Sequence, residues 1–120
     1  MIWTVKILEN FSLGEARCHG ESHDCGLTIL GPDLTAALSE VRRLYDKPII
    51  VTSWTRCKEH NAAVGGSERS YHLNGRAVDL KAARDDDSVH LREVCRDVFS
   101  FTKHYAFHIH CDVRGRRPRG

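Results

Sequence analysis

The stretch S-Y-H-L-N-G-R-A-V-D, from Ser70 to Asp79, decides how this chain folds. Its Asn-Gly pair is a strong reverse-turn signal. The residues that follow the turn, Arg76–Lys81, have the composition of a strand. A turn at this point brings His72 back beside Asp79, and the small side chain of Ala77 leaves room for a close approach. The stretch therefore predicts a loop histidine and a strand aspartate at one site.

A second group of polar side chains is predicted near the end of the chain. From Ala106 to Val113, apolar and polar residues alternate with a period of two, which is typical of a strand. One face of this strand is expected to meet the core through Phe107, Ile109, Cys111 and Val113. The opposite face then forms one wall of a site from His108, His110, Asp112 and Arg114.

These two segments together indicate a metal site. A catalytic zinc ion needs three nitrogen or oxygen ligands and an open position for water. His72, Asp79 and His110 supply such a set, whereas calcium would require oxygen ligands throughout. Each residue also has an ordinary interpretation, since single histidines are usually hydrogen-bonded and Asp79 can pair with Arg76. The combination of all three favours the metal.

Hydrophobic periodicity predicts two helices. The first follows Gly31-Pro32-Asp33 and ends before Pro48, and its apolar positions are Leu34, Leu38, Val41, Leu44 and Tyr45. The second follows Asp85–Ser88, a segment that offers N-cap chemistry and favourable charge at a helix start. Its apolar stripe consists of Leu91, Val94, Cys95 and Val98.

The order of the elements indicates the fold class. Ile49–Thr52 is a β-branched run that predicts a buried strand. The polar segment from Trp54 to Tyr71 predicts a loop with one helical turn at Lys58–Ala63. Strands and helices in mixed order predict an α+β domain with a small, mainly antiparallel sheet and flanking helices. The 120 residues suit a single domain over residues 1–120.

Composition excludes several classes of protein. No run approaches the roughly 18 apolar residues of a membrane helix, so membrane insertion is not expected. The first residues lack the pattern of a secretory signal. We therefore expect synthesis in a cytoplasm, and action outside a cell would require release by another route. The net charge of +2 is too weak to indicate nucleic-acid binding, and a monomer is expected.

The C-terminal tail and the cysteines each allow more than one interpretation. The tail over 114–120 contains four arginines and is either a solvated terminus or a contact for an anionic polymer. Five cysteines leave at least one thiol unpaired in a monomer. Cys18 and Cys25 form a disulfide, stay free, or hold a structural metal with nearby histidines. The other three are expected to be reduced, small buried hydrophobes: Cys57, Cys95 and Cys111.

The motifs resemble a known family. Ser70 to Asp79 fits S-x-H-x-x-G-x-A-x-D, the signature of the zinc peptidases that include D-Ala-D-Ala carboxypeptidases and L-Ala-D-Glu endopeptidases of bacterial cell walls. Short bacterial and phage members also show R-x-x-x-H-N-x-x-V-G-G, matched by Arg56 to Gly66, and H-x-D-x-R-G, matched by His110 to Gly115. A weaker similarity extends to the opening segment, through Asn10-Phe11-Ser12, Glu15 and Cys18.

The same residues resemble the signalling domain of hedgehog proteins, which shares this zinc fold. Gly75–Asp79 and His108–Cys111 match the corresponding strings closely. The resemblance implies the zinc fold and the ion. Because that relative is best known as a binding protein, a non-catalytic zinc-stabilised binding or virion structural module is the alternative to an enzyme.

The resemblance also implies roles. His72, Asp79 and His110 become the zinc ligands. Many family members carry an acidic residue three positions before the last ligand, where this chain has Phe107. His108 is the first substitute as catalytic base, because related murein peptidases share its H-x-H arrangement, and His104 is the second. Asp112 is expected to orient a ligand histidine, with a direct role left open.

Arg56 resembles the family arginine that binds the substrate carboxylate or the developing oxyanion. Its ordinary interpretation is a surface pair with Glu59 or Asp46. Ser70 and Asn61 complete the substrate-binding side, more as loop-ordering groups than as reactants. The predicted activity is zinc-dependent hydrolysis of amide bonds in peptidoglycan stem peptides by a D,D-carboxypeptidase or endopeptidase, including a phage endolysin.

Overall fold

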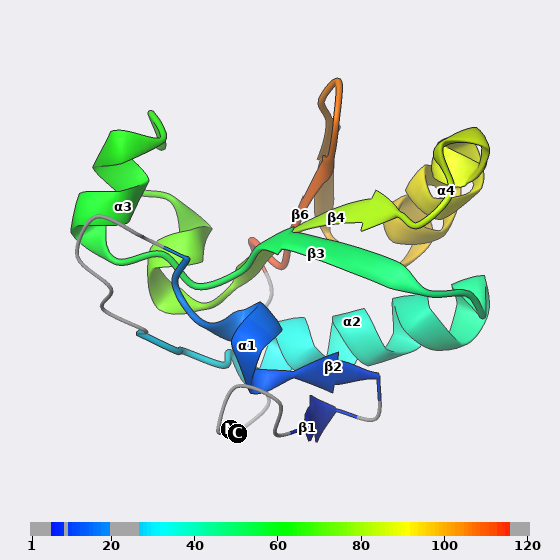
Figure 1. Ribbon diagram of the computed structural model, residues 1–120, viewed down its shortest axis with the longest axis horizontal. Coiled ribbons are helices and arrows are strands. Elements are labelled where there is room, and N and C mark those ends of the chain that lie inside the picture. The colour runs from blue at the N-terminus through cyan, green and yellow to red at the C-terminus, as the bar shows by residue number, and fades with distance from the viewer. Residues whose placement is uncertain (1–5, 9, 20–26, 116–120) are drawn as a thin grey trace.

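An antiparallel sheet organises the fold (Figure 1). The computed structural model describes residues 6–8, 10–19 and 27–115. In the order β3-β4-β6-β5, the strands of the sheet are Ile49–Ser53, Ala77–Ala82, Ile109–Asp112 and Phe101–His104. A separate pair is formed by β1 (Lys6–Leu8) and β2 (Phe11–Ser12). The predicted α+β class with an antiparallel sheet is confirmed.

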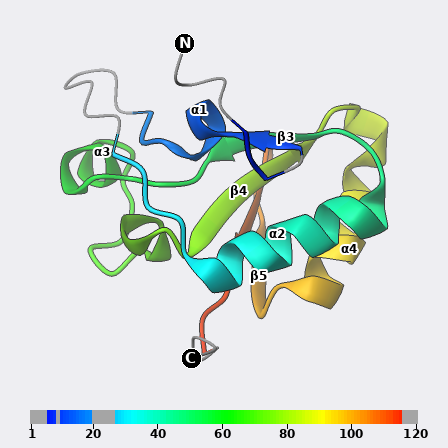
Figure 2. The same ribbon diagram turned by 90° about the horizontal axis from the view of Figure 1, so that it is seen from below.

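Two long helices cover one face of this sheet (Figures 1 and 2). They are α2 (Pro32–Tyr45) and α4 (Ser88–Val98), and both contribute to the main core cluster with Val78, Leu80 and Ile109. In α2, the proline stands in the first turn, where its missing N–H has no intrahelical partner to lose. The other face of the sheet is left free of these helices and carries the polar side chains.

Short elements complete the chain between the strands. They are α1 (Leu13–Ala16), α3 (Lys58–Ala63), η2 (Tyr71–Asn74) and η3 (Asp85–Asp87). The predicted helical turn at Lys58–Ala63 is therefore confirmed as α3. Both α3 and η2 lie between β3 and β4 in the sequence, where the polar loop was expected. They pack at one end of the sheet, which is the end that holds the candidate site (Figure 1).

The acidic run before α4 does not cap that helix as expected. Asp87 occupies the N-cap position, yet its side chain makes no capping hydrogen bond. It accepts hydrogen bonds from the Tyr45 hydroxyl and from the Lys47 ammonium, the latter at 2.9 Å. The carboxylate thus joins the end of α2 to the start of α4, a tertiary use that local capping rules do not include.

Two strand predictions need correction. The last strand begins at Ile109 rather than Ala106, because Tyr105 N–H donates to the His108 carbonyl and closes a hairpin turn. Phe107 lies in that turn and is 81% exposed, so it does not face the core. In β3, Ile49 is buried whereas Ile50 is exposed, because helices cover one face of the sheet only.

The predictions for the cysteines and for the basic tail are covered only in part by the described residues. Cys57, Cys95 and Cys111 are buried, as expected. Cys18 is buried too, but Cys25 lies outside the described residues, so the state of that pair stays a prediction. Of the basic tail, Arg114 and Gly115 are described, whereas residues 116–120 lie outside the described residues. Within the described part of the chain, no helix is long and apolar enough to cross a membrane.

Gly75 is the residue on which the turn before β4 depends. It ends η2 with a φ of 70°, a left-handed conformation that favours glycine. A Cβ at this position would lie 2.2 Å from the carbonyl oxygen of Ile29, because the Leu27–Leu30 segment passes directly beside it. The Gly31 N–H donates to the Gly75 carbonyl at 3.2 Å and fixes this contact.

We expect Gly75→Ala to destabilise the fold more than Gly65→Ala does. Gly65 has a similar φ of 73°, but a Cβ there meets nothing within 4 Å, so this control isolates the backbone cost of about 1–2 kcal/mol. The steric clash at position 75 should add about 2 kcal/mol or more. Urea unfolding of both variants measures the difference, and equal losses would contradict the close approach to Ile29.

Candidate metal centre

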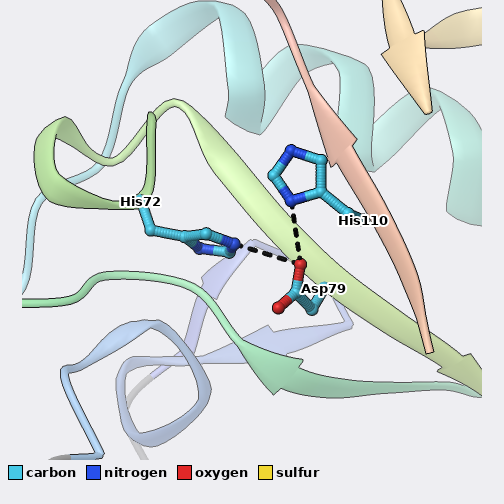
Figure 3. Close-up of side chains that lie close together, drawn as sticks. All are labelled: His72, Asp79 and His110. Carbon is cyan, nitrogen blue, oxygen red and sulfur yellow. Dashed lines mark hydrogen bonds and ion pairs between the residues drawn. The ribbon is translucent and has the colours of Figure 1, made fainter. Parts of the chain in front are cut away.

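The sheet register places the predicted ligands on one face. Asp79 of β4 is the direct cross-strand neighbour of His110 of β6, so their side chains project together from the face that the long helices leave free. His72 reaches the same point from η2, which the turn at Gly75 folds back toward β4 (Figure 3). The turn and the register together bring residues from three elements to one site.

The three side chains converge on a single carboxylate oxygen. Asp79 Oδ1 lies 3.0 Å from His72 Nε2 and 3.1 Å from His110 Nδ1. The three ligand atoms all lie within 4.8 Å of one another. Zinc bonds of about 2.0–2.2 Å in tetrahedral geometry separate neighbouring ligand atoms by about 3.3–3.6 Å. The two distances from Asp79 Oδ1 to the imidazole nitrogens are therefore within a few tenths of an ångström of those that a shared zinc ion requires.

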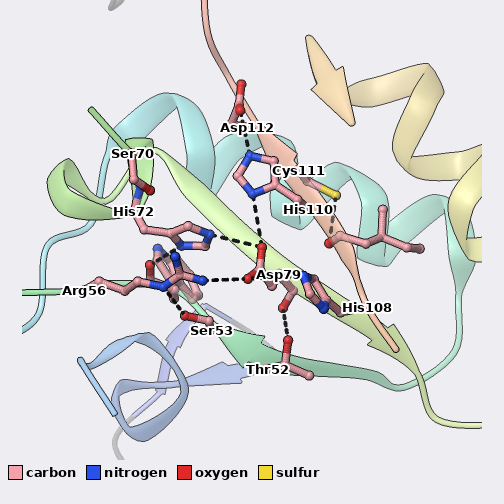
Figure 4. A network of polar contacts seen from close by, with 12 residues as sticks. Thr52, Ser53, Arg56, Ser70, His72, Asp79, His108, His110, Cys111 and Asp112 are labelled. Carbon is pink, nitrogen blue, oxygen red and sulfur yellow. Dashed lines mark hydrogen bonds and ion pairs between the residues drawn. The ribbon is translucent and has the colours of Figure 1, made fainter. Parts of the chain in front are cut away.

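Each imidazole is oriented by its other ring nitrogen (Figure 4). His72 Nδ1 lies 2.7 Å from the Trp54 carbonyl oxygen, which only accepts hydrogen bonds, so this nitrogen carries the proton. His110 Nε2 donates to Asp112 Oδ2 at 2.8 Å. In their neutral forms, both rings thus direct a lone pair at the Asp79 carboxylate. Lone pairs that face an anion repel it unless a cation lies between, and this arrangement fits a bound metal ion.

The charges of the site follow the same logic. Burial alone would raise the pKa of Asp79, but the hydrogen bond from protonated His110, the close contact with His72 and the charge of Arg56 hold this pKa well below its usual range. Burial lowers the pKa of His110, whereas its hydrogen bonds to Asp112 and Asp79 outweigh that effect and raise the pKa to about 9. The site therefore stabilises positive charge between the two carboxylates.

Arg56 supports the site from the β3 side. Its guanidinium donates to Asp79 Oδ2 at 3.0 Å, to Ser53 Oγ at 3.1 Å and to Asn61 Oδ1 at 3.4 Å. Arg56 therefore pairs with Asp79. This ion pair stands in place of the ordinary pairs that the sequence offered, which joined Arg56 to an acidic neighbour and Asp79 to Arg76. Three of the five N–H donors are used, and two stay available to a ligand.

Asp112 supports the site from the β6 side. It is fully buried, and it accepts from Arg114 Nη2 at 2.7 Å as well as from His110. The predicted orienting contact to a ligand histidine is therefore present. The direct catalytic role that was left open has no geometric support, because a fully buried carboxylate behind His110 offers no surface to a substrate.

A cleft of about 560 Å³ opens over the ligands. One wall comes from the segment between α3 and η2, and the other comes from β5 and the hairpin turn. Phe101, Lys103 and Tyr105 line the second wall. Sequence reasoning did not find these residues because β5 was not predicted, although their spacing of two with intervening polar residues is the pattern of a strand.

The two candidate bases lie in different places. His108 lines the cleft, with its Nε2 atom 3.7 Å from Asp79 Oδ2 and its ring stacked on Tyr105. His104 pairs with Ile109 in the β5–β6 register, so it projects toward the other face of the sheet and lines a separate hollow. The structure thus brings His108 to the ligand set and does not bring His104 there.

The two predicted loop residues act as local supports. Ser70 caps η2 by accepting a hydrogen bond from the His72 N–H at 3.2 Å, and its side chain lies at the edge of the cleft. Asn61 is buried and donates to the Ser67 carbonyl at 2.8 Å, which holds the loop that forms the first wall. Both contacts position His72 and the wall beside it.

A comparison of the chain with models of known protein families agrees with this geometry. A model of the peptidase M15 family matches residues 9–112, a range that includes all three ligands. The chain belongs to the peptidase M15 family. M15 enzymes are zinc-dependent metallopeptidases, which agrees with the donor set of two imidazoles and one carboxylate. Neither the curated proteins nor the solved structures contained a match.

We expect Asp112→Asn to weaken zinc binding by about 10- to 100-fold, because the residue orients His110 and adds to its basicity. The asparagine keeps the shape of the side chain and removes its charge. Asp86→Asn is the matched control, since Asp86 is exposed and pairs with Arg84 on the surface. Competition with a fluorescent zinc chelator measures both affinities, and equal values would contradict the orienting role of Asp112.

Proposed function

We propose that this protein is a zinc-dependent peptidase that hydrolyses amide bonds in peptidoglycan stem peptides, as a D,D-carboxypeptidase or an endopeptidase. The observation that carries the proposal is the convergence of His72, Asp79 and His110 below an open cleft that His108 also lines. Membership of the M15 family supports peptide hydrolysis. The wall-peptide substrate follows from the resemblance of the three motifs to wall peptidases.

The metal and the base have separate tasks in this scheme. Zinc, when bound, supplies Lewis acidity that activates water and polarises the scissile carbonyl. His108 accepts the proton of the attacking water and returns it to the leaving amine nitrogen as the C–N bond breaks. Its ring has access to both groups because its side chain is 32% exposed, whereas that of Asp79 is 5% exposed. Stacking on Tyr105 limits the orientations of the imidazole.

Arg56 stabilises negative charge that develops on the substrate. Its guanidinium is fixed by three acceptors and lies against Asp79, so it approaches the cleft without a loss of rotamer freedom on binding. The two remaining N–H donors suit a substrate carboxylate or the oxyanion of the tetrahedral intermediate.

We propose that the enzyme is made in a cytoplasm and reaches the wall after release or with a virion.

The direct test is mass spectrometry of purified wall fragments incubated with the zinc-loaded protein, with and without a chelator. New peptide termini that disappear with chelator and return with added zinc support the proposal, and their masses identify the bond. Intact fragments in the presence of zinc-loaded protein would favour the alternative, a zinc-stabilised binding module. One observation favours this alternative. Phe107 is an exposed apolar residue at the position where many family members carry an acid.

We expect His108→Ala to lower kcat by about 10²- to 10⁴-fold with zinc still bound, the usual contribution of a positioned base. His104→Ala is the comparison variant, because His104 projects toward the other face of the sheet and should change kcat little. Rates on the same wall peptide, with zinc content measured by mass spectrometry, separate the two. A full rate in the His108 variant would remove this residue from the mechanism.

A further inference from the structure

A row of four side chains crosses the sheet through the metal centre. The strand register pairs Ser53 with Asp79, Asp79 with His110, and His110 with Lys103. Paired residues in antiparallel strands project from the same face. Lys103 therefore lies one strand beyond the last ligand, about 4.8 Å along the row, on the edge strand β5.

The Lys103 ammonium has no acidic partner within the described residues. Its Nζ lies over the ring of Tyr105, 5.1 Å from the ring centroid. The other strand cation of the cleft differs in this respect, because Arg114 is paired with the buried Asp112. Arg56 is likewise neutralised by Asp79. Lys103 is thus a cleft cation whose charge is left for a ligand.

The balance of charge in the cleft points the same way. Four lining residues are permanently cationic, and of the lining residues only Asp79 is acidic: the cations are Arg56, Arg69, Lys103 and Arg114. A concave surface with one sign of charge concentrates ligands of the opposite sign. The zinc ion adds to this positive potential when it is bound. The cleft therefore suits a substrate with more than one negative group.

We propose that Lys103 is a specificity-determining residue that binds a second carboxylate of the substrate, on the opposite side of the scissile amide from Arg56. This inference rests on the proposed peptidase function in its D,D-carboxypeptidase form, since only there do the two carboxylates lie on opposite sides of the cleaved bond, and it narrows the substrate to peptides with two acidic groups. Arg56 contacts β3 through Ser53, and Lys103 stands on β5, so the two cations flank the ligands along the row.

The spacing of the two cations fits a short peptide. The Arg56 guanidinium lies between Ser53 of β3 and Asp79 of β4, so two to three strand intervals separate it from β5, a span of about 10–14 Å. An extended peptide covers that span with about three to four residues. A wall stem peptide has this chemistry, because the free α-carboxylate of its D-glutamyl residue and its C-terminal carboxylate are a few residues apart. Replacement of the D-glutamyl carboxylate by a carboxamide removes one charge with little change of shape.

The experiment compares two stem pentapeptides that differ only in this group, free carboxylate or carboxamide. For zinc-loaded wild-type protein, we expect kcat/KM to be about tenfold higher for the carboxylate peptide, mainly through KM, and the preference to weaken with added salt. Lys103→Ala should abolish the preference, Lys103→Glu should invert it, and Lys103→Arg should retain it. Lys58→Glu is the control, because it makes the same change of charge at an exposed residue outside this cleft.

A preference that is equal in wild type and Lys103→Ala would overturn the proposal. Failure of the underlying function gives a different result, since the wild-type protein would then cleave neither peptide. In that case calorimetric titration of both peptides into the zinc-loaded proteins decides the matter. Tighter binding of the carboxylate peptide that depends on Lys103 supports the assignment, and the same ratio of Kd values in wild type and Lys103→Ala rejects it.

Discussion

The buried carboxylate of Asp79 is the constraint on which the site depends. Its Oδ1 atom contacts ring nitrogens of His72 and His110, and its Oδ2 atom accepts a hydrogen bond from Arg56. One side chain therefore joins η2, β6 and the loop after β3. A buried carboxylate is costly unless it is paired and hydrogen-bonded. Arg56 and the two imidazoles meet that requirement, and the same contacts hold the imidazole nitrogens close enough for a metal ion. The same contacts therefore stabilise the local fold and prepare the site for zinc.

The groups around the metal site differ in how far they lie from solvent. Asp112 and the Trp54 carbonyl lie behind the two ligand histidines and set which ring nitrogen faces Asp79. His108 lies in front of the same carboxylate, at the surface of the cleft. Lys103 extends this arrangement to the edge of the sheet. Buried groups thus determine where the metal binds, and exposed groups determine what is bound beside it.

The ligands could be predicted from the sequence because turn chemistry and strand periodicity are local. The Asn-Gly turn returned His72 to Asp79, and the alternation of Ile109, Cys111 and Val113 placed His110 on the polar face. The pairing of Arg56 with Asp79 could not be predicted, since it joins residues 23 positions apart through tertiary packing. β5 was missed because it is a short, polar edge strand, and Phe107 was misplaced because hairpin closure overrides alternation at its turn.

The central claim is that His72, Asp79 and His110 bind one zinc ion. X-ray absorption spectroscopy at the zinc edge, on protein loaded with one equivalent of zinc, tests it most directly. The account predicts a first shell of nitrogen and oxygen only, with the multiple-scattering pattern of two imidazoles, at bond lengths of about 2.0–2.2 Å. Sulfur in the first shell, at about 2.3 Å, would contradict it, because cysteine rather than this triad would then hold the ion.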